Sequence, residues 1–240
     1  MDITIKGKKR NQDIRLTDDR LICDGTEYLY SDISSIWVGG LFSTSIDCTY
    51  RGRHHAFKID KDAKEEAEKA AAEAQKKIED FVRGFAYPVS NPKPVAEVYR
   101  FCKTQGLKSW DVSENNFTKW YERVMDQLEP DEEVRLPFQA TGFFRVSEKG
   151  ITMQMDQILF AGAATNRRMV FCQGVVKDGK IRSIPYDEIE NVSVSGQGLF
   201  TAVFIKCKNS ENNVGLKDVD SNLGRRIADV VRRGKALTDG

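Results

Sequence analysis

The chain carries the same pattern of residues twice. In the first copy, Tyr-Ser-Asp-Ile-Ser-Ser-Ile begins at Tyr30 and Gly-Leu-Phe-Ser begins at Gly40. In the second copy, Tyr-Asp-Glu-Ile-Glu-Asn-Val begins at Tyr186 and Gly-Leu-Phe-Thr begins at Gly198. A helical pattern of apolar residues follows each copy. Matched blocks in the same order indicate a duplicated domain, which constrains the architecture far more than it constrains the function.

A third matched block lies upstream of each tyrosine, where residues 16–22 correspond to residues 164–170. The chain has 240 residues, enough for two domains that each bury a core of their own. We therefore predict one domain over residues 1–86 and another over residues 129–237. Residues 87–128 lie between them and have no counterpart in the repeat.

Composition excludes several classes of protein. Lys and Arg number 37 against 36 Asp and Glu, which gives a formal net charge of +1 that is not divided between the two halves. A general nucleic-acid binder would carry a basic face, so nucleic acid is not an expected partner. The longest nearly apolar run, residues 158–164, is far shorter than the roughly 20 residues that span a bilayer.

Cysteine usage and the first residues bear on the compartment. The five cysteines are scattered and form no Cys-x-x-Cys pair. The start, Met-Asp-Ile-Thr, has no basic region followed by an apolar one, as a secretory signal would. We therefore expect a soluble cytoplasmic protein.

Residues 2–59 alternate short apolar runs with turn residues. β-branched and aromatic residues between Gly, Asn and Asp are typical of strands, and these runs predict about seven antiparallel strands. An amphipathic helix should then begin at Asp62, an acidic cap with Glu65 three residues later, and end at Gly84. Its predicted apolar face comprises Ala63, Ala67, Ala70, Ala74, Ile78, Phe81 and Val82.

Residues 95–128 have helical instead of extended patterns. Two apolar stripes predict a helical hairpin, with Ser113 as the N-cap of its second helix. The aromatic stripe is large for so short a segment, so the hairpin should bury it against one or both flanking domains. Strand patterns return from Glu133, and a last helix carrying Val219 should stop at Gly234.

Seven strands followed by one helix is the plan of the pleckstrin-homology (PH) superfold, and the second copy resembles bacterial PH-like domains. The resemblance rests on four pieces: Leu-Glu-Pro-Asp-Glu-Glu-Val at 128–134, Ala-Thr-Asn-Arg-Arg-Met-Val-Phe at 164–171, Ile-Pro-Tyr-Asp-Glu-Ile at 184–189, and Gly-Leu-Phe at 198–200. The first copy lacks the opening segment 128–134 and has Thr-Asp-Asp-Arg at 17–20. It is the more divergent of the two.

The resemblance covers residues 1–86 and 129–237. It implies a mainly β protein of the α+β class, with two PH-like seven-stranded barrels that each end in a helix and are joined by the helical hairpin. In such a fold the Thr-Asn or Thr-Asp before Arg makes a tight turn, and the residues after each tyrosine alternate into the core. The matched residues therefore specify a fold and not a reaction.

No motif in the sequence indicates catalytic chemistry. His54 and His55 are the only histidines, and neighbouring strand residues face opposite ways, so together they cannot bind a metal or form a proton relay. Gly-Gln-Gly at 196–198 begins like a dinucleotide fingerprint but leads into a strand pattern, which offers no helix N-terminus to a pyrophosphate. We expect no enzyme activity, no catalytic residue, no metal and no cofactor.

Two basic clusters are candidate anion-binding sites. Their residues are Lys6, Lys8, Lys9, Arg10, Arg51 and Arg53. The first four fall between the first two predicted strands, where the resemblance to PH domains implies a site for phosphoinositide head groups. The alternative is a solvated turn, because the near-neutral chain has no long-range attraction to an anionic membrane. The second cluster lies at a hairpin tip, and whether the two clusters share one face stays open.

Apolar residues beside glycines are candidate partner-binding residues. They are Trp37, Leu41, Phe42, Leu199 and Phe200. If they are exposed at a turn, they would anchor a partner or the other domain; otherwise they would plug the open end of their own barrel.

The expected function is that of a non-enzymatic cytoplasmic interaction or scaffold protein, which binds a protein partner through tandem PH-like domains. The alternative is a peripheral binder of anionic phospholipid head groups through residues 6–10. A third hypothesis, an enzyme acting at a cleft between the domains, would need convergent titratable groups that the sequence does not indicate.

Overall fold

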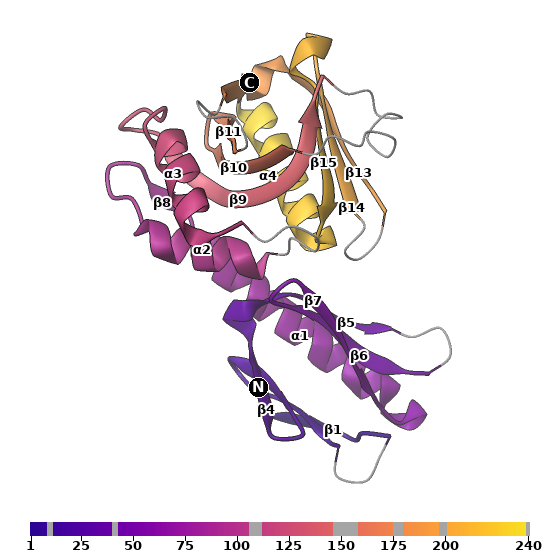
Figure 1. Ribbon diagram of the computed structural model, residues 1–240. Helices are drawn as coiled ribbons and strands as arrows, with labels where there is room; N and C mark the ends of the chain where they lie inside the picture. Colours follow the sequence, from indigo (N-terminus) through magenta and orange to yellow (C-terminus); the bar gives the residue numbers. More distant parts are fainter. Residues whose placement is uncertain are drawn as a thin grey trace. The chain divides into compact units, whose positions relative to one another are not determined.

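The computed structural model describes residues 1–8, 12–39, 43–105, 112–145, 158–174, 180–196 and 201–238. It divides into two compact units, Met1–Gly84 and Phe85–Gly240 (Figure 1). Both units combine helices with antiparallel strands, so the protein has the predicted α+β class. Over the residue ranges just given, no helix is long and apolar enough to cross a membrane.

The strands of the first unit form two antiparallel sheets, with the orders β1-β2-β3-β4 and β5-β6-β7. Their bounds are β1 (Ile3–Ile5), β2 (Ile14–Leu16), β3 (Arg20–Cys23), β4 (Thr26–Leu29), β5 (Ile33–Gly39), β6 (Ser45–Tyr50) and β7 (Arg53–Lys58), with the 3-10 helix η1 (Tyr30–Asp32) between the sheets. These strands lie where the sequence predicts them. Positive φ at Asp24 and Gly25, and again at Arg51 and Gly52, suits the two-residue type I′ turn of a tight hairpin.

A long helix completes the core of the first unit. After the 3-10 helix η2 (Lys61–Ala63), α1 (Lys64–Arg83) packs against β5 and ends at Gly84, as predicted. Its buried residues are Ala67, Ala70, Ala71, Ala74, Ile78 and Val82, and the small alanines allow a close approach to the sheet. Two details of the prediction are wrong. Ala63 is the N-cap and no side chain caps the helix, because η2 takes up Asp62. Phe81 lies at the border of the buried face, which continues through Val82, and is 42 % exposed.

One curved antiparallel sheet organises the second unit (Figure 1). Its order is β12-β11-β10-β9-β15-β14-β13, and the short β8 pairs with the N-terminal end of β9. The bounds are β8 (Tyr87–Pro88), β9 (Glu133–Phe144), β10 (Ile158–Thr165), β11 (Arg168–Gln173), β12 (Ile181–Pro185), β13 (Ile189–Ser195), β14 (Thr201–Cys207) and β15 (Val214–Val219). Two 3-10 helices lie between them, η4 (Tyr186–Glu188) and η6 (Ser210–Asn212).

Two of these strands differ from the prediction. The apolar runs at 134–138 and 143–146 predict two shorter strands, but β9 runs without a break from Glu133 to Phe144. β15 is absent from the prediction, which assigns Val219 to the last helix. Its pairing with both β9 and β14 joins the two halves of the sheet.

Helices cover both faces of β9, β10 and β11. α2 (Val95–Thr104) and α3 (Glu114–Met125) pack on one side, and α4 (Ser221–Thr238) packs on the other (Figure 1). Accordingly, every residue of β10 from Phe160 to Thr165 is buried. The predicted helical hairpin thus buries its aromatic stripe against the sheet of the second unit. Ser113 caps α3 as predicted, since its side chain accepts a hydrogen bond from the Asn116 N–H.

The predicted end of the last helix is wrong. α4 continues through Gly234 to Thr238, and Val219 belongs to β15. A Cβ atom added at Gly234 would lie 2.1 Å from Cδ2 of Tyr186. The missing side chain lets the helix touch the tyrosine ring, so this glycine serves helix packing and not helix termination.

Candidate functional site

The two repeated tyrosines sit in turns with the same backbone hydrogen bonds. The Tyr30 N–H donates to the Asp19 carbonyl at 2.8 Å, and the Tyr186 N–H donates to the Arg167 carbonyl at 3.3 Å. Each tyrosine begins a 3-10 helix that follows a strand. The two repeats thus build the same local structure.

The threonines of the third matched block also have matching roles. The hydroxyl oxygens of Thr17 and Thr165 lie 3.1 Å from the carbonyl oxygens of Arg20 and Arg168, respectively. Each threonine oxygen accepts a hydrogen bond from the N–H of that arginine, at 3.3 Å and 3.1 Å. A threonine with both contacts holds the tight turn that the sequence predicts.

In the second unit, other parts of the same unit cover the tyrosine ring and bind its hydroxyl. The Tyr186 ring is fully buried, and its hydroxyl donates to the Thr165 carbonyl at 2.7 Å. The backbone of α4 at Gly234 covers the ring. No polar group of the Tyr186 side chain is left for a ligand.

A buried ion pair fixes the same turn. Glu132 is fully buried, and its carboxylate accepts hydrogen bonds from Arg168 Nε at 3.1 Å, from Arg168 Nη2 at 2.9 Å and from the Thr165 hydroxyl at 2.7 Å. Burial alone would raise the pKa of Glu132, but these bonds outweigh it and hold the pKa below its usual value. Glu132 comes from the opening segment 128–134, which the first copy lacks.

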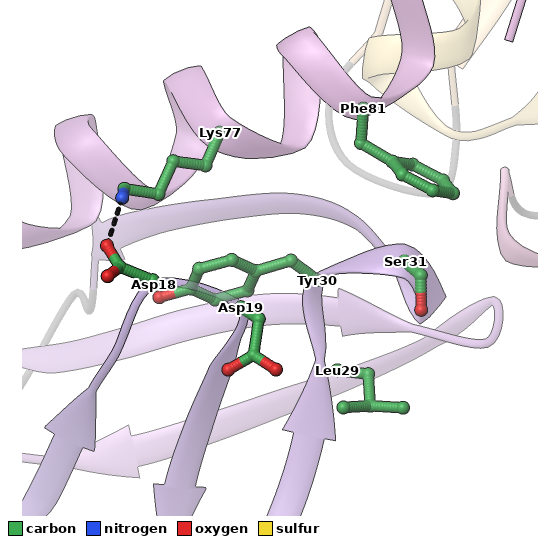
Figure 2. Close-up of a pocket in the computed structure, with 7 residues that line it drawn as sticks. All are labelled: Asp18, Asp19, Leu29, Tyr30, Ser31, Lys77 and Phe81. Carbon is green, nitrogen blue, oxygen red and sulfur yellow. Dashed lines mark hydrogen bonds and ion pairs between the residues drawn. The ribbon is translucent and has the colours of Figure 1, made fainter. Parts of the chain in front are cut away.

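In the first unit the corresponding turn borders an open pocket of about 240 Å³ (Figure 2). The pocket is lined by Asp18, Asp19, Leu29, Tyr30, Ser31, Lys77 and Phe81. Tyr30 is only 4 % exposed, yet its hydroxyl has no hydrogen-bond partner within the protein. A buried hydroxyl without a partner costs free energy, so it invites a ligand or a bound water.

The pocket has a polar end and an apolar end. Figure 2 shows the hydroxyl of Tyr30 pointing toward Asp18, with Asp19 beside the ring, while Leu29 and Phe81 lie toward the other end of the ring. Lys77 pairs with Asp18, and this hydrogen bond is the main reason why the pKa of Asp18 falls to about 2. Burial raises the pKa of Tyr30, and the negative charges nearby raise it further. The phenol is therefore neutral at physiological pH.

The apolar end is open to solvent. Leu29 is 38 % exposed and Phe81 is 42 % exposed, which makes them two of the four exposed large apolar side chains among the residues whose structure is described. The other two are Trp37 and Leu237. Exposed apolar groups that meet at one pocket are typical of a binding site.

A second pocket, of about 560 Å³, contains part of the first predicted basic cluster. It is lined by Lys8, Gln12, Cys23, Asp24, Thr26, Tyr28, Ala56, Phe57 and Lys58. The Lys8 N–H donates to the Lys58 carbonyl at 3.1 Å. Lys6 instead lies 3.7 Å from Asp60, and Lys9 and Arg10 lie outside the described residues.

The second basic cluster lies apart from this pocket. Arg53 begins β7 and Lys58 ends it, so a rise of about 3.4 Å per residue separates their Cα atoms by roughly 17 Å. Arg51 pairs with Asp32 at 2.6 Å and lies over the ring of Tyr50. The two clusters therefore sit at opposite ends of one strand and do not converge on one site.

The histidines point to opposite faces of β7, as the sequence predicts. His54 stacks on Trp37 with ring centroids 5.7 Å apart. His55 joins a cluster of rings with Tyr28, Tyr50 and Phe57. In the described part of the chain, no group of three or more His, Cys, Asp or Glu residues could hold a metal ion.

Of the apolar residues predicted to bind a partner, only Trp37 can be placed. It is 36 % exposed and stacks on His54. Nearby, the buried Asp47 accepts a hydrogen bond from the Ser45 hydroxyl at 3.2 Å and lies 3.5 Å from His54. Leu41, Phe42, Leu199 and Phe200 lie outside the described residues.

The sequence does not predict the Tyr30 pocket. Tyr30 belongs to the repeated block, whose pattern indicates turn and core positions, and its ring is buried. The sequence does contain one signal, because the first copy lacks the opening segment that supplies Glu132 to the second. Without the structure, nothing indicates that Lys77 and Phe81 of α1 would border the same tyrosine.

Comparison with known protein families identifies one domain. Residues 128–232 match the model of the family described as "Bacterial PH domain", and they form one such domain. This match confirms the resemblance for the second copy and does not extend to the first. Comparison with the curated proteins finds no match.

Proposed function

We propose that this protein is a non-enzymatic interaction protein that binds a protein partner, and that its first unit is a second, divergent PH-like domain. The open pocket beside Tyr30 carries the proposal, because it combines a buried hydroxyl without a partner and an exposed apolar rim. Interaction surfaces commonly combine an apolar anchor with a few polar groups that fix orientation.

Three features support the assignment of the first unit as a PH-like copy. Its described residues form seven antiparallel strands in two sheets, followed by α1. The turn at Tyr30 has the same backbone hydrogen bonds as the turn at Tyr186. The threonine bonds at Thr17 and Thr165 match as well.

The charged groups of the pocket favour recognition over catalysis. Asp18 pairs with Lys77, and Asp19 pairs with Arg20. A general base needs a pKa near the operating pH, whereas the pKa of Asp18 is lowered to about 2 and that of Tyr30 is raised. Such groups present fixed charge and hydrogen bonds to a partner.

Site-specific cross-linking tests the proposal. A photoreactive residue would replace Ser31, which lines the pocket, in the full chain exposed to a lysate of the source cells. We expect one defined protein adduct. A photoreactive residue at the exposed Lys119 of α3 is the matched control and should not give that adduct. The same adducts from both positions, or none from Ser31, would refute a partner at this pocket.

A second candidate function is the binding of anionic phospholipid head groups. The observation that favours it is the larger pocket, where Lys8 and Lys58 lie together with the polar side chains of Gln12 and Thr26. Asp24 in the same pocket opposes an anion, and the chain has a net charge of only +1.

Liposome sedimentation tests this candidate. The native chain should sediment with vesicles rich in anionic lipid. The Lys8→Glu and Lys58→Glu variants should stay in the supernatant. Lys119→Glu, which changes the net charge equally, should leave the binding unchanged. Binding that is insensitive to both pocket variants would exclude this site.

A further inference from the structure

We propose that the Tyr30 pocket receives a lysine side chain of the protein partner. This inference rests on the proposed function and names the chemistry that the pocket recognises. Its first support is the Tyr30 hydroxyl, which is almost completely buried and has no partner within the protein. A phenolic oxygen can accept a hydrogen bond from an ammonium group.

The charged groups around the Tyr30 hydroxyl determine which sign of charge a ligand can carry there. Asp18, Asp19 and Glu73 are close enough to raise the pKa of Tyr30. Lys77 and the N-terminal ammonium group of Met1 both pair with Asp18, and Arg20 is shared between Asp19 and Glu27. The four carboxylates, Glu73 included, exceed these three cations by one negative charge, so a carboxylate or phosphate would be repelled and an ammonium group attracted.

The shape of the pocket matches the stem of a lysine. The Tyr30 ring extends from the carboxylates at one end to Leu29 and Phe81 at the other (Figure 2). Lysine buries its methylene groups along apolar surface while its ammonium group reaches polar partners. With the ammonium at Asp19 and the Tyr30 oxygen, the methylenes would lie along the ring and the partner backbone near Leu29 and Phe81.

The helix supports the same orientation. Glu73, Lys77 and Phe81 follow one another at intervals of four residues, so they form one stripe of α1. This stripe repeats the polarity of the pocket, with an acidic residue, a basic residue and an apolar residue in order. The second unit has no equivalent stripe, because Gly234 brings α4 onto the ring of Tyr186.

A titration with short peptides tests the inference on the full chain. The probe is acetyl-Leu-Lys-Leu-amide, and the readout is the NMR signal of ring-labelled Tyr30, assigned from its loss in Tyr30→Phe. We expect the signal to shift with a dissociation constant in the millimolar range. The peptide with norleucine in place of lysine keeps the stem without the charge and should bind at least about tenfold more weakly, since one charge-assisted hydrogen bond corresponds to about that factor.

Variants of the protein locate the binding. Asp19→Asn should weaken binding of the lysine peptide about tenfold while the norleucine peptide is unaffected. Tyr30→Phe should weaken it as well, measured by calorimetry because the Tyr30 signal is then lost. Tyr186→Phe removes the corresponding hydroxyl of the second unit and is the matched control, with binding unchanged.

The remaining outcomes each overturn the inference. Equal binding of the lysine and norleucine peptides would make the pocket a general apolar site. Butylammonium ion that binds as tightly as the peptide would make it a site for free amines. No shift at Tyr30 would mean that the pocket holds water only. In that last case a specific adduct at Ser31 would still support a protein partner, so failure of the lysine site and failure of the proposed function are distinguishable.

Discussion

The turns at Tyr30 and Tyr186 have the same backbone hydrogen bonds and different surroundings. At Tyr186 the hydroxyl donates to the Thr165 carbonyl, and the helix covers the ring. At Tyr30 the hydroxyl has no partner, and a pocket remains beside the ring. The hydrogen bonds of the turn therefore do not determine whether the tyrosine ring is covered or borders a pocket.

Residues from outside the turn make the difference. The opening segment of the second unit supplies Glu132, which holds Arg168 and Thr165 in place. Gly234 then allows α4 to close over the tyrosine. The first unit has neither feature, and its helix presents Lys77 and Phe81 instead. The second unit thereby closes its tyrosine turn, while the first unit keeps an open pocket beside Tyr30.

The largest expected effect comes from breaking the buried ion pair of the second unit. Glu132→Gln would leave Arg168 without its carboxylate, which should cost about 2–4 kcal/mol of the free energy of unfolding of that unit. Glu27→Gln is the matched change in the first unit, where the pair with Arg20 is exposed to solvent and its loss should cost much less. Hydrogen exchange followed by mass spectrometry measures both units in the same chain. Equal losses would show that the two turns are stabilised alike.

The next largest effect comes from adding a side chain at Gly234, where α4 contacts the Tyr186 ring. Gly234→Ala would force a methyl group against the Tyr186 ring, and overpacking of this kind costs about 1–3 kcal/mol. Gly84→Ala is the control, because a Cβ there meets only the carbonyl oxygens of Asp80 and Phe81, at 3.4 Å or more. It should stabilise the first unit by about 0.4–1 kcal/mol or leave it unchanged. The measurement is thermal unfolding. A melting temperature that falls equally in both variants would contradict this role for Gly234.

Much of the backbone could be predicted from sequence, and the open site could not. The strands of the first unit and the bond pattern of both turns follow from local residue types, such as Thr before Arg. The site depends on which residues α1 and α4 place against each tyrosine. Gly234 reads locally as a helix end, and its real role appears only where Tyr186 is close in space.

The hydroxyl groups give a smaller contrast. Tyr186→Phe removes a buried hydrogen bond and should cost about 1 kcal/mol. Tyr30→Phe removes a hydroxyl without a partner, so the first unit should lose no stability and can gain some. The measurement is the same hydrogen exchange experiment on each variant. A loss at Tyr30 as large as that at Tyr186 would indicate an internal partner for the Tyr30 hydroxyl and would argue against the open site.

The smallest expected effect is a difference in pH dependence between two buried carboxylates. Burial raises the pKa of Asp47 above its usual 3.8, and Ser45 and His54 counter it only in part. Glu132 has a pKa below its usual 4.5, because Arg168 and Thr165 overcome the effect of burial. An acid with a raised pKa contributes most to stability while it is protonated, and that contribution is lost as the pH rises through the folded pKa. An acid with a lowered pKa contributes most above its usual pKa, and loses that contribution as the pH falls through the folded value.

The two units should therefore respond to acid with opposite signs at these positions. Urea unfolding at several values between about pH 3 and 7, with pulse hydrogen exchange at one fixed labelling pH, resolves each unit. With Asp47 present, the first unit should become less stable as the pH rises above 3.8, and Asp47→Asn should abolish this dependence. With Glu132 present, the second unit should become less stable as the pH falls below 4.5, and Glu132→Gln should abolish this dependence. Slopes of the same sign would mean that Asp47 is held by its neighbours as firmly as Arg168 holds Glu132, and the contrast between the two units would then be confined to the tyrosine turns.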